Sequence, residues 1–198
     1  MLQLVVGLLG YGAAVMVMVL SGLGAASWSV LSEGVAKTLG VSFGTATNAV
    51  AVAVLLTWIP MRELSGVGTV LNVLVVGWAA DLTALVVPVP ATLGLRYVYL
   101  VVAVVAIAFF DALYLGAQFG SGPRDGLMTG LVRLTRLPVA VVRTAIEVCV
   151  ATLGWVLGGQ VGVGTVLLAL VMGPLVSVFL PRLAVRLPDH APPARRPQ

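Results

Sequence analysis

Four charged residues lie within otherwise apolar stretches of the sequence: Asp81, Asp111, Arg143 and Glu147. A charge at the centre of a bilayer costs at least ~2.5 kcal/mol, so such residues face a partner or a water-filled cavity. Arg143 and Glu147 are four residues apart and can pair on one helical face, which leaves a structural clamp and a solute or proton site as equal alternatives. Asp81 and Asp111 have no such neighbour. We expect Asp111 to face a central cavity, where it couples ions or recognises a solute amine.

Two short polar segments, residues 24–39 and 120–135, begin with residues that suit a helix N-terminus, namely Gly followed by Ser or Pro. An N-terminus that points into the membrane presents free N–H groups and a partial positive charge, which can bind an anion or carboxylate. The alternative is an amphipathic helix that lies flat among the lipid headgroups. The Gly-rich approach in both segments favours the broken or re-entrant form. The candidate substrate-binding or gating residues here are Ser27, Trp28, Pro123, Arg124 and Asp125, and Arg124 alternatively serves a cytoplasmic gate.

The amino-acid composition indicates that these segments belong to an integral membrane protein. Of the 198 residues, 60% are hydrophobic and 9% are charged, whereas a soluble domain carries roughly 25% charged residues. Six apolar stretches approach the ~20 residues that span a bilayer as a helix, and none alternates like a barrel strand. The first has no preceding Lys or Arg, so we interpret it as a membrane helix and not as a signal peptide. The stretches cover residues 2–24, 42–60, 66–88, 95–118, 137–157 and 161–181.

The distribution of basic residues predicts the topology. With a cytoplasmic N-terminus, the inner segments hold eight arginines and the outer segments hold only Lys37 and Arg96. Both termini are therefore expected in the cytoplasm, and the Pro-rich residues 185–198 are expected to form a disordered tail. We also expect four aromatic residues near span ends to be interfacial anchors: Trp58, Trp78, Tyr97 and Tyr99. The eight arginines are Arg62, Arg124, Arg133, Arg136, Arg182, Arg186, Arg195 and Arg196.

An internal repeat organises the chain. The sequence GVGTVL occurs at residues 66–71 and again at residues 162–167, an offset of 96, and the same offset pairs Lys37 with Arg133. Residues 1–90 and 91–184 then form two three-helix repeats, which enter the membrane from opposite sides because three is odd. The sequence therefore predicts an all-α membrane protein of about six transmembrane helices in two inverted repeats, each with a short broken or re-entrant helix. The hydroxyls of Thr69 and Thr165, within the repeated motif, suit either helix packing or solute contact.

Several classes of function are excluded. The single Cys149 and single His190 cannot form a metal, haem or disulfide site, so no metal and no cofactor are expected. There is no continuous basic face and no nucleic-acid motif. An enzyme is not expected either, since no Gly-x-Ser-x-Gly or His-based motif is present. The expected partners are the lipid bilayer and a small-molecule solute, and a homo-oligomer is left open.

The run GSGPRDGLMTGLVRLTRLPVAVVRTAIEV, followed by LGGQVGVGTVLLALVMGPLV, resembles the YczE/YyaS/YitT-like group of bacterial membrane proteins. The first half matches less closely, since Ser27-Trp28-Ser29 stands where the second half has Pro123-Arg124-Asp125. The resemblance implies a multi-pass protein of the bacterial inner membrane. Members of the group often look like neighbours of regulators that bind pyridoxal phosphate, which hints at an amino compound or vitamin.

Together these features predict a multi-pass transporter of a small polar solute, either an organic anion, an amino compound or a vitamin. We expect the solute site at the interface of the repeats, near the middle of the bilayer. Two alternatives remain. One is a non-transporting accessory or scaffold protein of a membrane complex, and the other is a passive channel.

Overall fold

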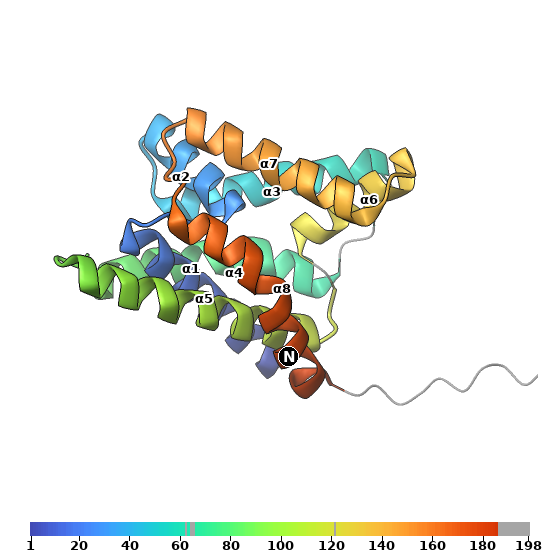
Figure 1. Ribbon diagram of the computed structural model, residues 1–198. Helices are drawn as coiled ribbons and strands as arrows, with labels where there is room; N and C mark the ends of the chain where they lie inside the picture. Colours follow the sequence, from blue (N-terminus) through green and yellow to red (C-terminus); the bar gives the residue numbers. More distant parts are fainter. Residues whose placement is uncertain (62, 64–65, 121, 186–198) are drawn as a thin grey trace, which may run out of the picture.

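The computed structural model describes residues 1–61, 63, 66–120 and 122–185, and in that part of the chain every regular element is an α-helix (Figure 1). Six helices are long and apolar enough to cross a membrane, which confirms the expected spans to within a few residues. Two shorter helices, α2 and α6, complete the set. The long helices are α1 (Leu2–Ser21), α3 (Phe43–Met61), α4 (Val67–Val86), α5 (Leu93–Gly116), α7 (Val139–Val156) and α8 (Val163–Leu183); the short ones are α2 (Ser27–Leu39) and α6 (Pro123–Thr135).

The helix bounds follow the offset of 96 residues. Helix α6 begins and ends 96 residues after α2, and the starts of α7 and α8 lie 96 residues after those of α3 and α4. Opposite membrane orientation of the two halves stays a prediction. The expected tail, apart from Val185, lies outside the described residues, as do Arg62, His190 and the last three arginines.

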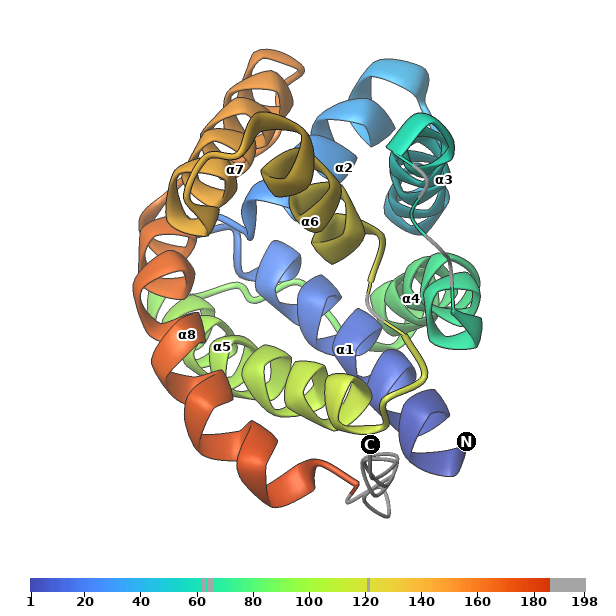
Figure 2. The ribbon, with the colours of Figure 1, turned by 90° about the vertical axis from the view of Figure 1, so that its right-hand side faces the viewer.

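The eight helices form two layers, which both views separate (Figures 1 and 2). The lower layer contains α1, α4, α5 and α8, and the upper layer contains α2, α3, α6 and α7. In the lower layer α1 packs along α5, with Met18, Leu100 and Ile107 fully buried between helices. Helix α1 also packs closely on α4, because Gly12 has no side chain to collide with the Val76 carbonyl. In the upper layer Trp28 packs against Val54 and Val150.

The two loops that precede the short helices pass the starts of α8 and α4. After α1, the Leu23 carbonyl accepts the Gly164 N–H at 2.8 Å, and after α5 the Phe119 carbonyl accepts the Gly68 N–H at the same distance. These two hydrogen bonds are related by the 96-residue offset. Each joins a loop of one half to a helix of the other, so the halves are interlocked at equivalent points.

Thr69 and Thr165, the threonines of the repeated motif, stabilise the first turns of α4 and α8, which these loops pass. The Thr69 Oγ1 atom accepts the Gly66 N–H and the Thr165 Oγ1 atom accepts the Gly162 N–H, both at 3.2 Å. Such bonds satisfy backbone donors that a helix leaves free at its first turn. The observed position of both hydroxyls therefore fits the packing interpretation.

Candidate functional site

The N-termini of α2 and α6 meet in the middle of the molecule. The guanidinium carbon of Arg124 lies 5.3 Å from the centre of the Trp28 ring, and its Nη1 atom donates to the Tyr11 hydroxyl at 3.3 Å. Trp28 and Arg124 are the second residues of the two short helices, and Tyr11 is midway along α1. Both N-termini therefore lie beside the middle of a long apolar helix. This placement favours re-entrant helices over helices that lie flat at the surface.

Trp58 fixes the start of α6. Its Nε1–H donates to the Pro123 carbonyl at 3.0 Å, and its side chain is only 4% exposed. The expectation that Trp58 is an interfacial anchor was therefore wrong, since the indole donor is used inside the protein. Trp78, by contrast, is 70% exposed on α4.

Pro123 and Ser27 open their helices in different ways. Pro123 stands in the first turn of α6, as expected. At α2 the cap residue is Ala26 and no side chain forms a capping hydrogen bond, so Ser27 does not cap the helix, although its residue type suits a helix N-terminus. Ser27 lies one position inside the helix, where its hydroxyl is not placed to cap the first turn.

We call the group around these N-termini the central cluster. It combines Asp111 and Tyr114 from α5 with the residues already described, and the charges of Asp125, Arg124 and Arg143 all act on Asp111. Three members belong to the lower layer and three to the upper layer, so the cluster lies where the layers meet. Its members are Tyr11, Trp28, Asp111, Tyr114, Arg124 and Asp125.

Asp125 follows Arg124 in the first turn of α6 and is open to solvent on one side. The protein atoms around its carboxyl group nevertheless exclude enough water to raise its pKa above the usual value. The positive charge of Arg124, and more weakly that of Arg143, opposes this shift. The central cluster thus holds two carboxyl groups, those of Asp111 and Asp125, and one guanidinium group, that of Arg124, which can balance only one negative charge.

Arg124 keeps donors for a further acceptor. The two ion pairs in the described part of the chain are Lys37 with Glu33, at 2.7 Å, and Arg133 with Glu63, at 2.9 Å. Within that part, no carboxylate oxygen lies within 4.0 Å of Arg124. A guanidinium group carries five N–H donors and binds carboxylates through two at once. Such a group at the start of α6 can bind the carboxylate or other anionic group of a solute.

Arg143 and Glu147 do not form an ion pair in the described part of the chain. Arg143 is exposed on α7, and its charge acts on Asp111 and Asp125. Glu147 is half-buried on the same helix. This arrangement offers no support for the clamp, and the interpretation of the two residues as a solute or proton site stays a prediction.

Asp81 lies away from the central cluster and stabilises the start of α3. Its carboxylate accepts the Ser42 hydroxyl at 2.6 Å and the Gly44 N–H at 2.7 Å. Two donors compensate for the cost of this charge near the end of α4. The partner that we expected Asp81 to find elsewhere in the bundle is therefore the first turn of α3.

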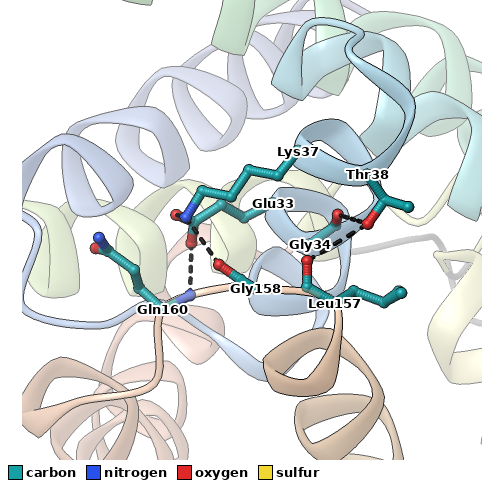
Figure 3. Close-up of polar contacts among 7 residues, drawn as sticks. All are labelled: Glu33, Gly34, Lys37, Thr38, Leu157, Gly158 and Gln160. Atoms are coloured by element: carbon teal, nitrogen blue, oxygen red, sulfur yellow. Dashed lines mark hydrogen bonds and ion pairs between the residues drawn. The ribbon is translucent and has the colours of Figure 1, made fainter.

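The outer end of α2 is fastened to the loop after α7 (Figure 3). Lys37 pairs with Glu33 and its Nζ atom also donates to the Gly158 carbonyl at 2.8 Å. The second carboxylate oxygen of Glu33 accepts the Gln160 N–H at 2.9 Å. Both side chains of the ion pair thus join the first half of the chain to the second.

The outer end of α6 is fastened in an equivalent way. Arg133, which the offset pairs with Lys37, forms its ion pair with Glu63 and donates to the Met61 carbonyl. Both acceptors belong to the end of α3 and the residues that follow it. Each short helix is therefore held at its outer end by a basic residue bound to the opposite half, while its N-terminus lies in the central cluster.

The model of a family of unknown function, DUF6198, matches residues 1–181. The chain belongs to this family. An uncharacterised protein of Haemophilus influenzae is 39% identical over 185 residues, which cover 93% of this chain and 83% of the relative. The uncharacterised membrane protein YczE of Bacillus subtilis is 27% identical over 85% of this chain and 79% of its own length. The uncharacterised protein YyaS of the same organism is 26% identical over 89% and 90%.

These relatives confirm the resemblance to YczE and YyaS, and with the six apolar helices they indicate a multi-pass membrane protein. No solved structure matches the chain. The central cluster of this DUF6198 member therefore has to be interpreted from its own geometry.

Sequence reasoning missed Tyr11 and Tyr114. Tyr114 is 3% exposed and its hydroxyl lies 3.5 Å from the Gly120 carbonyl, in the loop that leads to α6. A hydroxyl group within an apolar span needs a hydrogen-bond partner, as a charged group does, although its burial costs less. The tyrosines in the apolar stretches 2–24 and 95–118 could therefore have been predicted as candidate site residues.

Proposed function

We propose that the protein transports a small polar solute across the membrane and binds it at the central cluster. The observation that carries this proposal is the position of Arg124. Its guanidinium group lies at the N-terminus of a re-entrant helix, beside the middle of α1, with Trp28 of the other short helix against its face. Discontinuous helices whose N-termini point at a solute are a recurring device of transporters.

The charges of the cluster favour a solute with a negative group. Arg124 and the partial positive charge at the N-terminus of α6 attract a carboxylate or other anion. Asp111 and Asp125 offer acceptors for an amine on the same solute. An organic anion, an amino compound or a vitamin fits this combination of groups.

The arrangement of helices supports transport by a carrier. Helix bounds and loop contacts repeat at the same offset, and the cluster lies between the halves. An inverted repeat with both termini in the cytoplasm of a bacterial cell would place the cluster near the middle of the bilayer. A scaffold protein has no need for a half-buried arginine at that depth that forms no ion pair with the described residues.

Flux into proteoliposomes tests the proposal. A panel of amino acids, vitamins and organic anions is first screened for ligands that raise the melting temperature of the purified protein. With the best ligand, Arg124→Ala is expected to lower the flux by at least ~10-fold, the loss expected when a hydrogen bond to a charged group is removed. The matched control is Arg182→Ala, an exposed arginine at the end of α8, for which flux within about twofold of the parent is expected.

Three outcomes would contradict the proposal. Unchanged flux in Arg124→Ala would remove the assigned site. Stabilisation by no ligand, together with no flux, would indicate a scaffold protein. Flux that never saturates and needs no ion gradient would indicate a passive channel.

A further inference from the structure

Helices α7 and α8 leave open space between them, whereas the equivalent helices of the first half do not. Gly77 of α4 lies so close to Gly44 of α3 that a Cβ atom on either would collide with the carbonyl oxygen of the other. At Gly173 of α8, which the offset pairs with Gly77, an added Cβ atom would meet nothing within 4 Å. Helices α7 and α8 barely touch in the described structure, and Figure 1 shows them spreading apart from the loop that joins them.

The sequence of the second half keeps this space open. Between α3 and α4, the Asn48 side-chain oxygen accepts the Gly77 N–H at 3.1 Å, and the Asp81 carboxylate accepts two donors at the start of α3. None of these residues except the glycine of α8 recurs in the second half, and a Cβ atom stands where Gly44 makes its close approach. The second half has Pro138, Ala140, Thr144 and Ser177 where the first has Ser42, Gly44, Asn48 and Asp81.

Two charged residues of α7 lie beside this space. Arg143 is exposed, and Glu147 is half-buried one turn further along the same helical face. The charge of Arg143 acts on Asp111 of α5, so its side chain lies on the side of α7 that faces the lower layer. Neither residue forms an ion pair with another residue that the structure describes. A charge within a membrane span needs a partner or water, and lipid tails in this space would supply neither.

We call the space the α7–α8 opening. Arg143 and Glu147 line it on α7, and the exposed residues Gly173 and Ser177 line it on α8. The charge of Arg143 also acts on Asp125, which is itself exposed at the start of α6. The opening therefore extends from the second turn of α7 to the central cluster.

Opposite charges occur at two places along this route. The first place has Arg143 and Glu147, and the second has Arg124 with Asp111 and Asp125. A simple anion would be repelled by three carboxyl groups on its way, and a simple cation by two guanidinium groups. A solute that carries both a carboxylate and an amine can bind an arginine and a carboxyl group together at each place.

We infer that the α7–α8 opening is a water-filled entrance through which a zwitterionic solute reaches the central cluster, with Arg143 and Glu147 as its first binding place. This inference rests on the proposed transport function and narrows the solute to an amino compound that also carries an anionic group. Water in the opening solvates both charges of α7 when no solute is present.

The reaction of single cysteines with charged thiol reagents tests this inference in the full-length protein. Cys149 is first replaced by alanine, and Gly173→Cys or Ser177→Cys then places one thiol in the opening. Leu74→Cys is the control, because Leu74 is 55% exposed on α4 and lies away from the opening. The reagents are two methanethiosulfonates, one with a negative sulfonate group and one with a positive trimethylammonium group. Mass spectrometry follows both reactions in lipid nanodiscs.

Both thiols in the opening are expected to react at least ~10-fold faster than the control, because the reactive thiolate forms in water and not in hydrocarbon. After correction for the rates with a free thiol, neither reagent should be strongly preferred. Arg143→Gln should then favour the positive reagent and Glu147→Gln the negative one. Each substitution is expected to change the ratio of the two rates by roughly 3- to 10-fold, the effect of a unit charge several ångströms away in water.

Three results would overturn the inference. Rates in the opening equal to that of the control would mean that lipid fills the space. A strong preference of the parent for one reagent would exclude a route for zwitterions. An unchanged ratio in both charge variants would remove Arg143 and Glu147 from the route.

None of these rates depends on flux, so failure of this inference can be told apart from failure of the proposed function. Reactive thiols in a protein that carries no solute would refute transport and leave the water-filled opening in place. Unreactive thiols in a protein whose flux still depends on Arg124 would refute only this entrance.

Discussion

Arg124 has two neighbours of unlike chemistry, the hydroxyl of Tyr11 and the ring of Trp28. A cation over an indole ring is stabilised by roughly 0.5 to 2 kcal/mol, depending on its exposure, but the ring does not consume N–H donors. Arg124 is thus held in place, and its remaining N–H donors can still bind an anionic group. Lysine would not reproduce this arrangement, because its ammonium group has neither the planar face that stacks on the indole ring nor the fork of parallel N–H donors that binds a carboxylate.

Trp58 holds the start of α6 through the hydrogen bond from its indole N–H to the Pro123 carbonyl. Substitution by phenylalanine removes this hydrogen bond and keeps an aromatic side chain. Trp58→Phe leaves the Pro123 carbonyl without its buried donor and is expected to lower the free energy of unfolding by ~1–3 kcal/mol. Chemical unfolding in mixed micelles measures the change. Trp78→Phe is the control, since Trp78 is exposed and a change within ~0.5 kcal/mol is expected. Equal losses in both variants would contradict the assigned role.

For single residues, the sequence predicted which charged side chains need a partner but not which partner each one contacts. Asp81 and Arg124 carry the same kind of signal, a charge beside an apolar stretch. One caps a neighbouring helix and the other lies in the central cluster. The difference arises from tertiary contacts across some 40 to 110 residues, and no local pattern encodes these.

The short helices depend on glycines at the turns that precede them. Gly24 and Gly120 have φ of 103° and 117°, in the region that favours glycine, and each lies against the start of a helix from the opposite half. These turns direct the chain back towards the centre after α1 and α5. Without them, α2 and α6 would continue outwards from the long helices.

Gly24→Ala and Gly120→Ala are therefore expected to be destabilising by at least ~2 kcal/mol each, because alanine adds backbone strain and a steric clash. Unfolding of the purified variants gives the values. Gly94→Ala is the control, since a Cβ atom there meets nothing within 4 Å and the backbone is helical. If the two turn variants were as stable as the control, the turns would not need glycine.

The six long helices were predictable because length and hydrophobicity alone decide whether a segment spans a bilayer. The bounds of α2 and α6 were nearly predictable from their Gly-rich starts. Their depth was not, since an amphipathic surface helix and a re-entrant helix share one pattern. The contact of Arg124 with Tyr11, midway along α1, favours the re-entrant form.

The whole molecule consists of two layers whose contact is tightest between α3 and α4, where Gly44 and Gly77 leave no room for a Cβ atom. The equivalent helices α7 and α8 barely touch in the described structure. A Cβ atom added to Gly173, the α8 residue equivalent to Gly77, would meet nothing within 4 Å. The equivalent positions of the two halves therefore differ in their tolerance of a larger side chain.

Gly173→Leu is expected to leave the melting temperature within ~2 °C of the parent, because the space beside Gly173 is open, whereas Gly77→Leu is expected to lower it by several degrees, because a Cβ atom there meets the Gly44 carbonyl. Thermal unfolding of the purified variants measures both changes. Equal melting temperatures in the two variants would show that the close contact of α3 and α4 does not stabilise the protein.

The fastening of each short helix to the opposite half also affects how the protein is made. Glu33 and its partner Gln160 are 127 residues apart, so at 5–20 residues per second the ribosome needs roughly 10 s to supply the partner. During that interval Glu33 can pair with Lys37, but its second carboxylate oxygen lacks the Gln160 N–H and the Leu23 carbonyl lacks the Gly164 N–H. The first half of the chain therefore completes its polar contacts only after the second half has been synthesised.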